Sequence, residues 1–477
     1  MTQSHFRPGL RLLIAALGLY AGTTTAMAQA PTPAPPSVLP ANPGAAHPTP
    51  GSVVVGRPDA LTTPCPDCAA DKPAQPDPVP FGGPLLERPK LTGDWFGART
   101  AMRDSGITWD ISSTNFYSGV ASGGLKDTFQ YRGRADYLLH VDGEKAGLWQ
   151  GLFIDLHGES VFGDSINRFT GTLLPVSLAQ SLPSSQGSVT ALSGVKVTQA
   201  LSENFVLFAG KINTLDGFNQ PFTGGARGVD GFQNTALLFN PVTIRTVPYS
   251  TLGAGFAVLD KNQEAVISGA VFDTNNTPTV SGFDTFFDNG VTVFAAVNLP
   301  TKFLGLPGHQ GLTGTYSSGT YFNLQPTPFI DRVEGIGLRN PTKKGSWSAA
   351  YAFDQALYVS PCDPKRSWGV FGNLGLADDN PSPVRWAANL GVGGASPLPC
   401  RKLDTFGVGY FYTGLSDSLK QLAPRLLPIR DEQGVELFYN VAVTPWCHVT
   451  PDLQVVSPGR ERVDTVLFCG LRAKIDF

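Results

Sequence analysis

Polar and apolar side chains alternate with a period of two through much of this 477-residue sequence. In segment 152–159, positions 152, 154 and 156 hold Leu or Ile. Positions 155, 157 and 159 hold Asp, His and Glu. Segments 131–142 and 467–477 repeat the pattern. Because successive side chains of a strand point to opposite faces, these segments predict strands with one dry and one wet face.

Beyond its N-terminal end, the sequence lacks any apolar segment of the roughly 18 residues that a membrane-spanning helix needs. A chain that crosses hydrocarbon without helices must pair its backbone groups within a closed barrel. We therefore expect an all-β fold, a transmembrane antiparallel β-barrel of about 16 strands, with a short N-terminal helix and a Pro-rich N-terminal spacer. The predicted strands are 107–117, 129–142, 149–161, 190–201, 204–213, 249–259, 264–273, 290–299, 310–323, 346–355, 367–376, 384–392, 404–414, 433–444, 448–457 and 462–477.

The connections between these strands favour a barrel with both chain ends on the periplasmic side. Short gaps such as 202–203 and 260–263 alternate with long gaps such as 162–189 and 214–248, as periplasmic turns alternate with outer loops in such barrels. The 54 glycines, 10% aromatic residues and 15% charged residues fit strands that meet lipid on one face and water on the other. A soluble β-sandwich or propeller would share the strands and glycines but would not need a wet face on nearly every strand.

The first 89 residues differ in composition from the rest. Residues 1–28 resemble a secretory signal peptide, with basic residues, an apolar run that is short for a membrane anchor, and small residues at a cleavage site. Residues 29–89 are rich in Pro and Ala, which predicts a disordered spacer that tethers the barrel domain at 90–477 or contacts the cell wall. Its Cys65 and Cys68 predict a local disulfide or two idle thiols. Directly after it, Asp94 and Gly106 bound a predicted helix.

Several short blocks resemble a known family. The segment Leu91–Arg99, which reads LTGDWFGAR, resembles the opening block of the OprB-type carbohydrate-selective porins. The resemblance implies a barrel of about 16 strands in the bacterial outer membrane that conducts sugars such as glucose-like mono- and oligosaccharides. The other blocks that carry it are Gly133–Asp136, Leu174–Ser177, Glu436–Asn440, Thr444–Trp446 and Thr450–Gln454, followed by the terminal Phe477.

Polar residues on the predicted wet faces are the candidates for contact with a passing sugar. A neutral sugar needs hydrogen-bond acceptors and planar donors that replace part of its water shell without slowing its release. The long connection 214–248 and the helix near Trp95 are candidates for a plug or constriction, where aromatic rings could stack on sugar rings. The same residues could instead hydrate a wide lumen, brace neighbouring strands or belong to a solvated outer loop. The candidates are Arg132, Arg134, Asp136, Asp155, His157, Glu159, Arg227, Asp230, Phe232, Asn234 and Arg245, with Phe239 beside them.

Other functions rest on weaker features. A general or anion-preferring diffusion pore would use the same scaffold. The segment Phe162–Ser165 resembles the nucleophile block of GDS-type esterases, but no histidine lies three residues after an aspartate, where that chemistry takes its base. We therefore expect a channel and not an enzyme.

The expected partners are outer-membrane lipid, small carbohydrate solutes and, if the barrel is a homo-oligomer, further copies of the chain. The net charge of -3 argues against a nucleic-acid partner. No metal-ligand spacing or cofactor motif occurs, so neither a metal nor a cofactor is expected. Cys362 and Cys400 fall in successive predicted periplasmic turns and are candidates for a disulfide.

Overall fold

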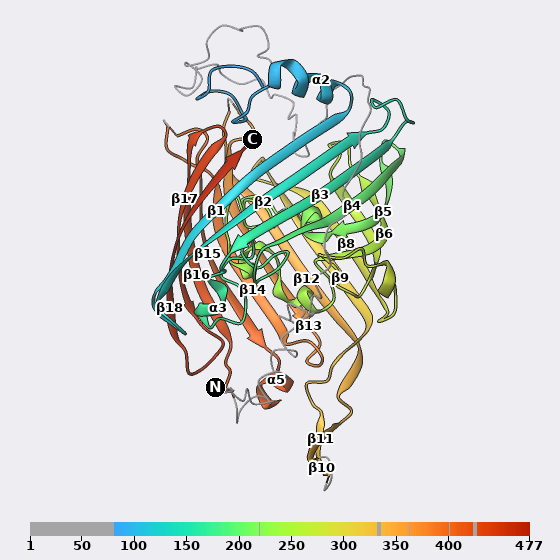
Figure 1. Ribbon diagram of the computed structural model, residues 1–477, viewed down its shortest axis with the longest axis vertical. Helices are drawn as coiled ribbons and strands as arrows, with labels where there is room; N and C mark the ends of the chain where they lie inside the picture. Colours follow the sequence, from blue (N-terminus) through green and yellow to red (C-terminus); the bar gives the residue numbers. More distant parts are fainter. Residues whose placement is uncertain (1–80, 219, 332–334, 362, 400, 423–426) are drawn as a thin grey trace, which may run out of the picture.

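A closed antiparallel barrel of sixteen strands forms the body of the protein in the computed structural model (Figure 1). The structure describes residues 81–477 except 219, 332–334, 362, 400 and 423–426. The last strand pairs with the first, so the barrel has no open edge and the backbone groups of its strands form hydrogen bonds within the barrel. The barrel strands are β1 (Ile107–Gly124), β2 (Thr128–Asp142), β3 (Leu152–Gly163), β4 (Val189–Ser202), β5 (Phe205–Asn213), β6 (Ser250–Leu259), β7 (Ala265–Asp273), β8 (Val291–Phe303), β9 (Leu306–Phe322), β12 (Thr342–Val359), β13 (Ser367–Ala377), β14 (Val384–Ala395), β15 (Thr405–Leu415), β16 (Glu432–Thr444), β17 (Cys447–Ser457) and β18 (Asp464–Asp476).

All sixteen predicted strands are confirmed, and the largest difference is an additional hairpin. Strands β10 (Thr327–Asp331) and β11 (Gly335–Arg339) pair with each other inside a stretch that the sequence predicts to be one long loop. The hairpin projects beyond the end of the barrel opposite the C-terminus (Figure 1). Strands of five residues are too short for a period-two pattern to separate them from a loop.

The helices are short, and most of them lie in the connections. They are η1 (Trp95–Gly97), α2 (Ala98–Asp104), α3 (Asn167–Thr170), η2 (Thr214–Gly217), α4 (Thr235–Leu238), η3 (Pro241–Arg245), η4 (Phe283–Thr285) and α5 (Asp417–Leu422). Among the described residues, no helix is both long enough and apolar enough to cross a bilayer.

The predicted N-terminal helix is present as η1 and α2, at the rim of the barrel. Asp94 Oδ1 accepts hydrogen bonds from the backbone N–H and the hydroxyl of Thr100, both at 2.8 Å, which stabilises the first turn of α2. Arg99 Nη2 donates to the carbonyl oxygens of Trp109 and Phe477, at 2.9 and 2.7 Å. These bonds hold α2 at the rim where the C-terminus lies, beyond the end of the barrel strands (Figure 1).

Residues 81–89 also differ from the prediction of a disordered spacer. They form turns next to α2, with the N–H groups of Glu87 and Arg88 donating to Pro84 O at 3.0 Å. Trp446 Nε1, in the turn between β16 and β17, donates to Leu85 O at 2.7 Å. The end of the spacer is therefore part of the folded rim.

Strand β16 illustrates the two faces of the wall. Val435 and Leu437 point outward and are 41% and 46% exposed, whereas Glu432 and Glu436 point inward and are buried. The expected wet inner face does not hold for β5 to β8. There Phe208, Ile212, Ala270, Phe272 and Phe294 form an apolar inner wall, because that wall packs against a loop inside the barrel.

Glycines on the inner face of β13 to β15 leave room for the same loop. A Cβ atom at Gly375 would lie 2.5 Å from Asn240 Oδ1, and one at Gly407 would lie 2.7 Å from the Phe232 ring. The main hydrophobic cluster, which includes Phe232, Leu237, Phe371 and Phe411, is thus formed between loop and wall and not within a solid core.

Candidate pore constriction

Two long connections fold into the barrel. We call residues 164–188, between β3 and β4, the first inner loop, and residues 214–249, between β5 and β6, the second inner loop. The backbone N–H groups of Gln233 and Asn234 donate to the carboxyl oxygens of Glu436 at 2.6 and 2.9 Å. Because Glu436 points inward from β16, the second inner loop lies inside the barrel.

The second inner loop crosses the whole bore. Its ends are at β5 and β6, whereas β16 is separated from β5 by six strands on one side and eight on the other. On that far wall, Arg472 Nη1 and Nη2 of β18 donate to Gly228 O and Gly231 O at 3.1 and 2.9 Å. Since all these groups are buried, each bond replaces one that water would make, and the loop is firmly attached.

The first inner loop is attached to the same wall and to the second loop. Glu432 accepts hydrogen bonds from the N–H groups of Leu173 and Leu174 at 2.7 and 3.0 Å. Leu178 N donates to Gln233 O at 3.0 Å, and Thr235 N donates to Pro175 O at 3.1 Å. The two loops therefore form one layer inside the barrel, which extends from β16 toward β3.

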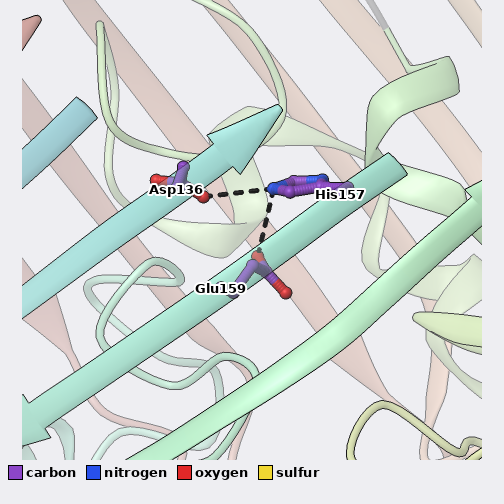
Figure 2. A group of neighbouring side chains, drawn as sticks. All are labelled: Asp136, His157 and Glu159. Atoms are coloured by element: carbon purple, nitrogen blue, oxygen red, sulfur yellow. Dashed lines mark hydrogen bonds and ion pairs between the residues drawn. The ribbon is translucent and has the colours of Figure 1, made fainter. Parts of the chain in front are cut away.

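A buried ionic cluster lies where this layer meets β2 and β3. Figure 2 shows the ring of His157 facing the carboxylates of both Asp136 and Glu159, and its Nε2 lies 3.2 Å and 3.7 Å from their nearest oxygens. Arg134 Nη2 forms an ion pair with Asp136 at 2.7 Å and a second one with Glu159. All four side chains are at most 3% exposed.

The cluster also holds both ends of the second inner loop. His157 Nδ1 lies 2.8 Å from Asp216 Oδ2, in η2 at the start of the loop. The hydroxyl of Tyr249, the last residue of the loop, donates to Glu159. The register of the loop relative to the wall is thus set by groups on β3.

Asp136, His157 and Glu159 have ligand atoms within 4.8 Å of one another, a spacing that could hold a metal ion. Arg134 already donates to both carboxylates, and its guanidinium supplies the positive charge that a metal would supply. A divalent cation would be repelled by this buried arginine. The arrangement therefore serves as an ion-pair network.

Most of the sequence-predicted site residues are buried by the inner loops, which corrects the expectation that they face water. Arg132 donates to Gly163 O and Ser184 O at 2.7 and 2.5 Å, and Asn234 caps α4 through Ala236 N at 3.0 Å. Phe232 packs between Phe371 and Phe438, with ring centroids 5.4 and 4.9 Å away. The predicted residues with at most 2% exposure are Arg132, Arg134, Asp136, His157, Glu159, Phe232 and Asn234.

The remaining predicted residues keep part of their surface exposed. Asp155 pairs with His140 at 2.5 Å and with Lys196 at 3.3 Å, and all three are roughly one-third exposed. Asp230, whose side chain is 42% exposed, pairs with Lys474 of β18 at 2.5 Å.

Two arginines of the second inner loop complete this partly exposed set. Arg227 is partly exposed. Arg245 is also partly exposed and lies over the ring of Tyr321 at 5.3 Å.

Sequence reasoning missed the residues that hold the loops. Glu436 and Arg472 do stand on the inner faces of predicted strands, so the alternation placed them on the correct side, whereas Glu432 directly precedes the predicted strand 433–444 and begins β16 in the structure. Nothing local distinguishes them from polar residues that only meet water, because their partners are distant in sequence. The loop residue Asp216 was missed for the same reason.

The predicted disulfide between Cys362 and Cys400 lies outside the described residues and stays a prediction. The same holds for the signal peptide, for the Cys65–Cys68 pair and for the spacer before residue 81. Cys447 and Cys469 are described, and both are free thiols.

Comparisons with known proteins decide the family. The model of the family described as "Carbohydrate-selective porin, OprB family" matches residues 126–477. The chain belongs to this family. The predicted resemblance is confirmed, and the chain is a bacterial outer-membrane β-barrel.

Individual relatives agree with this assignment. Porin B of Pseudomonas aeruginosa is 28% identical over 207 residues, which are 38% of this chain and 45% of Porin B, so the match spans about half of that relative. The high-pH structure of Pseudomonas putida OprB superposes with a TM-score of 0.70 at 20% identity, covering 83% of this chain and all of that one. The low-pH structure of the same protein superposes with a TM-score of 0.52 at 17% identity, covering 82% of this chain and 99% of that one.

Proposed function

We propose that this OprB-family barrel conducts small neutral carbohydrates by passive diffusion through a water-filled lumen, narrowed by the two inner loops to a polar constriction. The observation that carries the proposal is the second inner loop, which is attached to the wall on both sides of the bore. A layer fixed in this way restricts the size of the solute and presents the same groups to every solute that passes.

Charges of both signs support a neutral substrate. Partly exposed Asp230 and Lys474 lie at one side of the second inner loop, and Asp155 and Lys196 pair on the wall. Such pairs offer acceptors and donors to hydroxyl groups, while their fields largely cancel. A sugar can therefore exchange hydration water for protein contacts without being held by a strong charge.

The predicted site residues then divide into two roles. We assign Asp155, Arg227, Asp230 and Arg245 to the lumen surface, where a solute can reach them. We assign the buried residues Arg132, Arg134, Asp136, His157, Glu159, Phe232 and Asn234 to positioning the inner loops. The second group acts on permeation only through the loop that it holds.

Liposome swelling tests the proposal. Proteoliposomes placed in isosmotic glucose should swell faster than protein-free liposomes, and glucose should enter faster than a neutral amino acid of similar size. Equal swelling rates for the two solutes would show that the protein is a general pore. Swelling rates equal to those of protein-free liposomes would overturn the proposal.

An anion-preferring pore is the second candidate, because Arg227 and Arg245 are both on the second inner loop. An anion-preferring pore predicts that the reversal potential in a KCl gradient lies close to the equilibrium potential of chloride. The sugar pore predicts weak selectivity between chloride and potassium.

The hydrolase alternative has less support, since Ser165 is buried and its hydroxyl accepts a hydrogen bond from Asn167 N at 3.3 Å. An ester-hydrolysis assay on the same preparation tests this alternative.

A further inference from the structure

The inner wall of β5 to β8 is apolar where a water-filled pore would be expected to be polar. Phe208, Phe272 and Phe294 point inward, next to Ile212 and Ala270. Outward positions of the same strands, such as Leu207 and Val293, are exposed as lipid-facing residues should be. These strands therefore carry apolar residues on both faces.

The second inner loop adds two phenylalanines to this wall. The ring of Phe218 meets Phe294 edge to face, with centroids 6.4 Å apart and planes at 89°. The ring centroid of Phe239 lies 6.5 Å from that of Phe218, with the planes at 30°. The wall continues through Phe272, whose centroid is 6.3 Å from that of Phe294. The rings thus form a continuous aromatic strip from wall to loop.

Part of this strip is in contact with the lumen. Phe218, Phe239 and Phe294 are only partly buried, unlike Phe232 and Phe272, which are at most 5% exposed. Since all three rings lie inside the barrel, their exposed parts face the lumen and not the lipid. Aromatic surface that is left in water favours any solute that can cover it.

A hydrogen-bond acceptor lies close to Phe218 in the chain. Asp216 is two residues before Phe218, and its side chain is 35% exposed. His157 Nδ1 holds Asp216 Oδ2 at 2.8 Å, so the carboxylate is fixed in position. Flat aromatic faces beside a fixed acceptor suit a solute that has an apolar face and polar edges.

We infer that Phe218, Phe239 and Phe294 form a stacking subsite for the ring of a pyranose, with Asp216 accepting a hydrogen bond from a ring hydroxyl. This inference rests on the proposed function and specifies its substrate class. The C–H face of a pyranose is apolar and planar enough to cover an aromatic ring, whereas an open-chain polyol has no such face. The subsite therefore favours cyclic sugars over acyclic polyols of the same size.

Current noise from single channels, titrated with glucose and with the open-chain hexitol sorbitol, tests the subsite. Wild type should bind glucose more tightly than sorbitol. Phe218→Leu and Phe294→Leu keep apolar bulk but lose the flat face, and each should weaken glucose binding about threefold to tenfold while sorbitol is unchanged. Phe303→Leu is the matched control, because Phe303 is on β8 but points outward and is 63% exposed.

The outcomes separate this inference from the proposed function. If wild type admits no glucose, the proposed function fails. If wild type admits glucose but binds glucose and sorbitol equally, or if the two variants keep the wild-type ratio, only the stacking subsite is refuted. A merely structural role of the rings would change open-channel conductance and weaken both solutes equally, which would also refute the subsite.

Discussion

Glu436 of β16 accepts the backbone N–H of Gln233 at 2.6 Å, although the two residues are 203 positions apart in the chain. The bond joins the far wall of the barrel to the middle of the second inner loop. Its neighbour, the N–H of Asn234, donates to the other carboxyl oxygen of Glu436 at 2.9 Å. One side chain therefore satisfies two buried backbone groups that no strand or helix satisfies.

Replacing Glu436 with alanine should loosen the second inner loop. Two buried N–H groups would lose their acceptors, at a cost of about 1–3 kcal/mol each, and the loop would leave the bore part of the time. We expect single-channel conductance to rise and exclusion of large sugars to weaken. Glu203→Ala, in the exposed turn between β4 and β5, is the control. Wild-type conductance in Glu436→Ala would contradict the anchoring role.

The buried ionic cluster should contribute far more to stability than an exposed pair does. Arg134→Ala would leave Asp136 and Glu159 without their common partner in a buried site, which typically costs about 3–5 kcal/mol. Arg168→Ala breaks a pair with Asp164 in which both side chains are at least half exposed, and should cost about 1 kcal/mol or less. The unfolding temperature of each variant can be measured from the shift of its gel mobility on heating. Equal shifts for the two variants would show that the cluster is dispensable.

Small side chains on the inner wall should control where the second inner loop sits. A Cβ atom at Gly393 would lie 2.2 Å from the backbone oxygen of Phe222, so Gly393→Ala must displace the loop or the strand. We expect a destabilisation of about 1–3 kcal/mol and an altered conductance. Gly314→Ala provides the comparison, because nothing lies within 4 Å of a Cβ atom there. The idea fails if both variants conduct as wild type does.

Ion selectivity should follow the pair formed by Asp230 and Lys474. Asp230→Asn removes a partly exposed negative charge, so the chloride-to-potassium permeability ratio should rise, and Lys474→Gln should lower it. Each change should be about twofold to fivefold, because a nearby unit charge in water contributes about 1 kcal/mol or less. Reversal potentials in a KCl gradient give the ratio, with Asp363→Asn in an exposed turn as control. If both substitutions changed the permeability ratio in the same direction, the pair would not lie on the permeation path.

The strands could be predicted because alternation is a local property. Whether Val435 and Leu437 face lipid depends only on strand geometry and on the need to cover apolar surface, both of which a short segment expresses. The prediction that the inner face carries polar side chains was wrong at Phe208 and Phe294. Phe294 contacts the ring of Phe218, which belongs to a different part of the chain.

The candidate site was predicted only in part, for the same physical reason. The sequence placed Arg134, Asp136, His157 and Glu159 on the inner faces of adjacent strands, and strand pairing does bring them together. It did not reveal that the inner loops cover them, since a loop has no periodicity that reports its path. The roles of Glu436 and Arg472 depend on that path.

The sequence by itself determined a closed, two-faced barrel, because pairing every backbone group in hydrocarbon leaves one solution for a chain of alternating strands. Only the tertiary structure decided which inner side chains meet water and which hold the loops. That choice depends on hydrogen bonds between residues that are distant in the chain, such as Glu432 with Leu173 and Arg472 with Gly228. Their free energy arises only when the barrel has closed around the loops and water has been excluded.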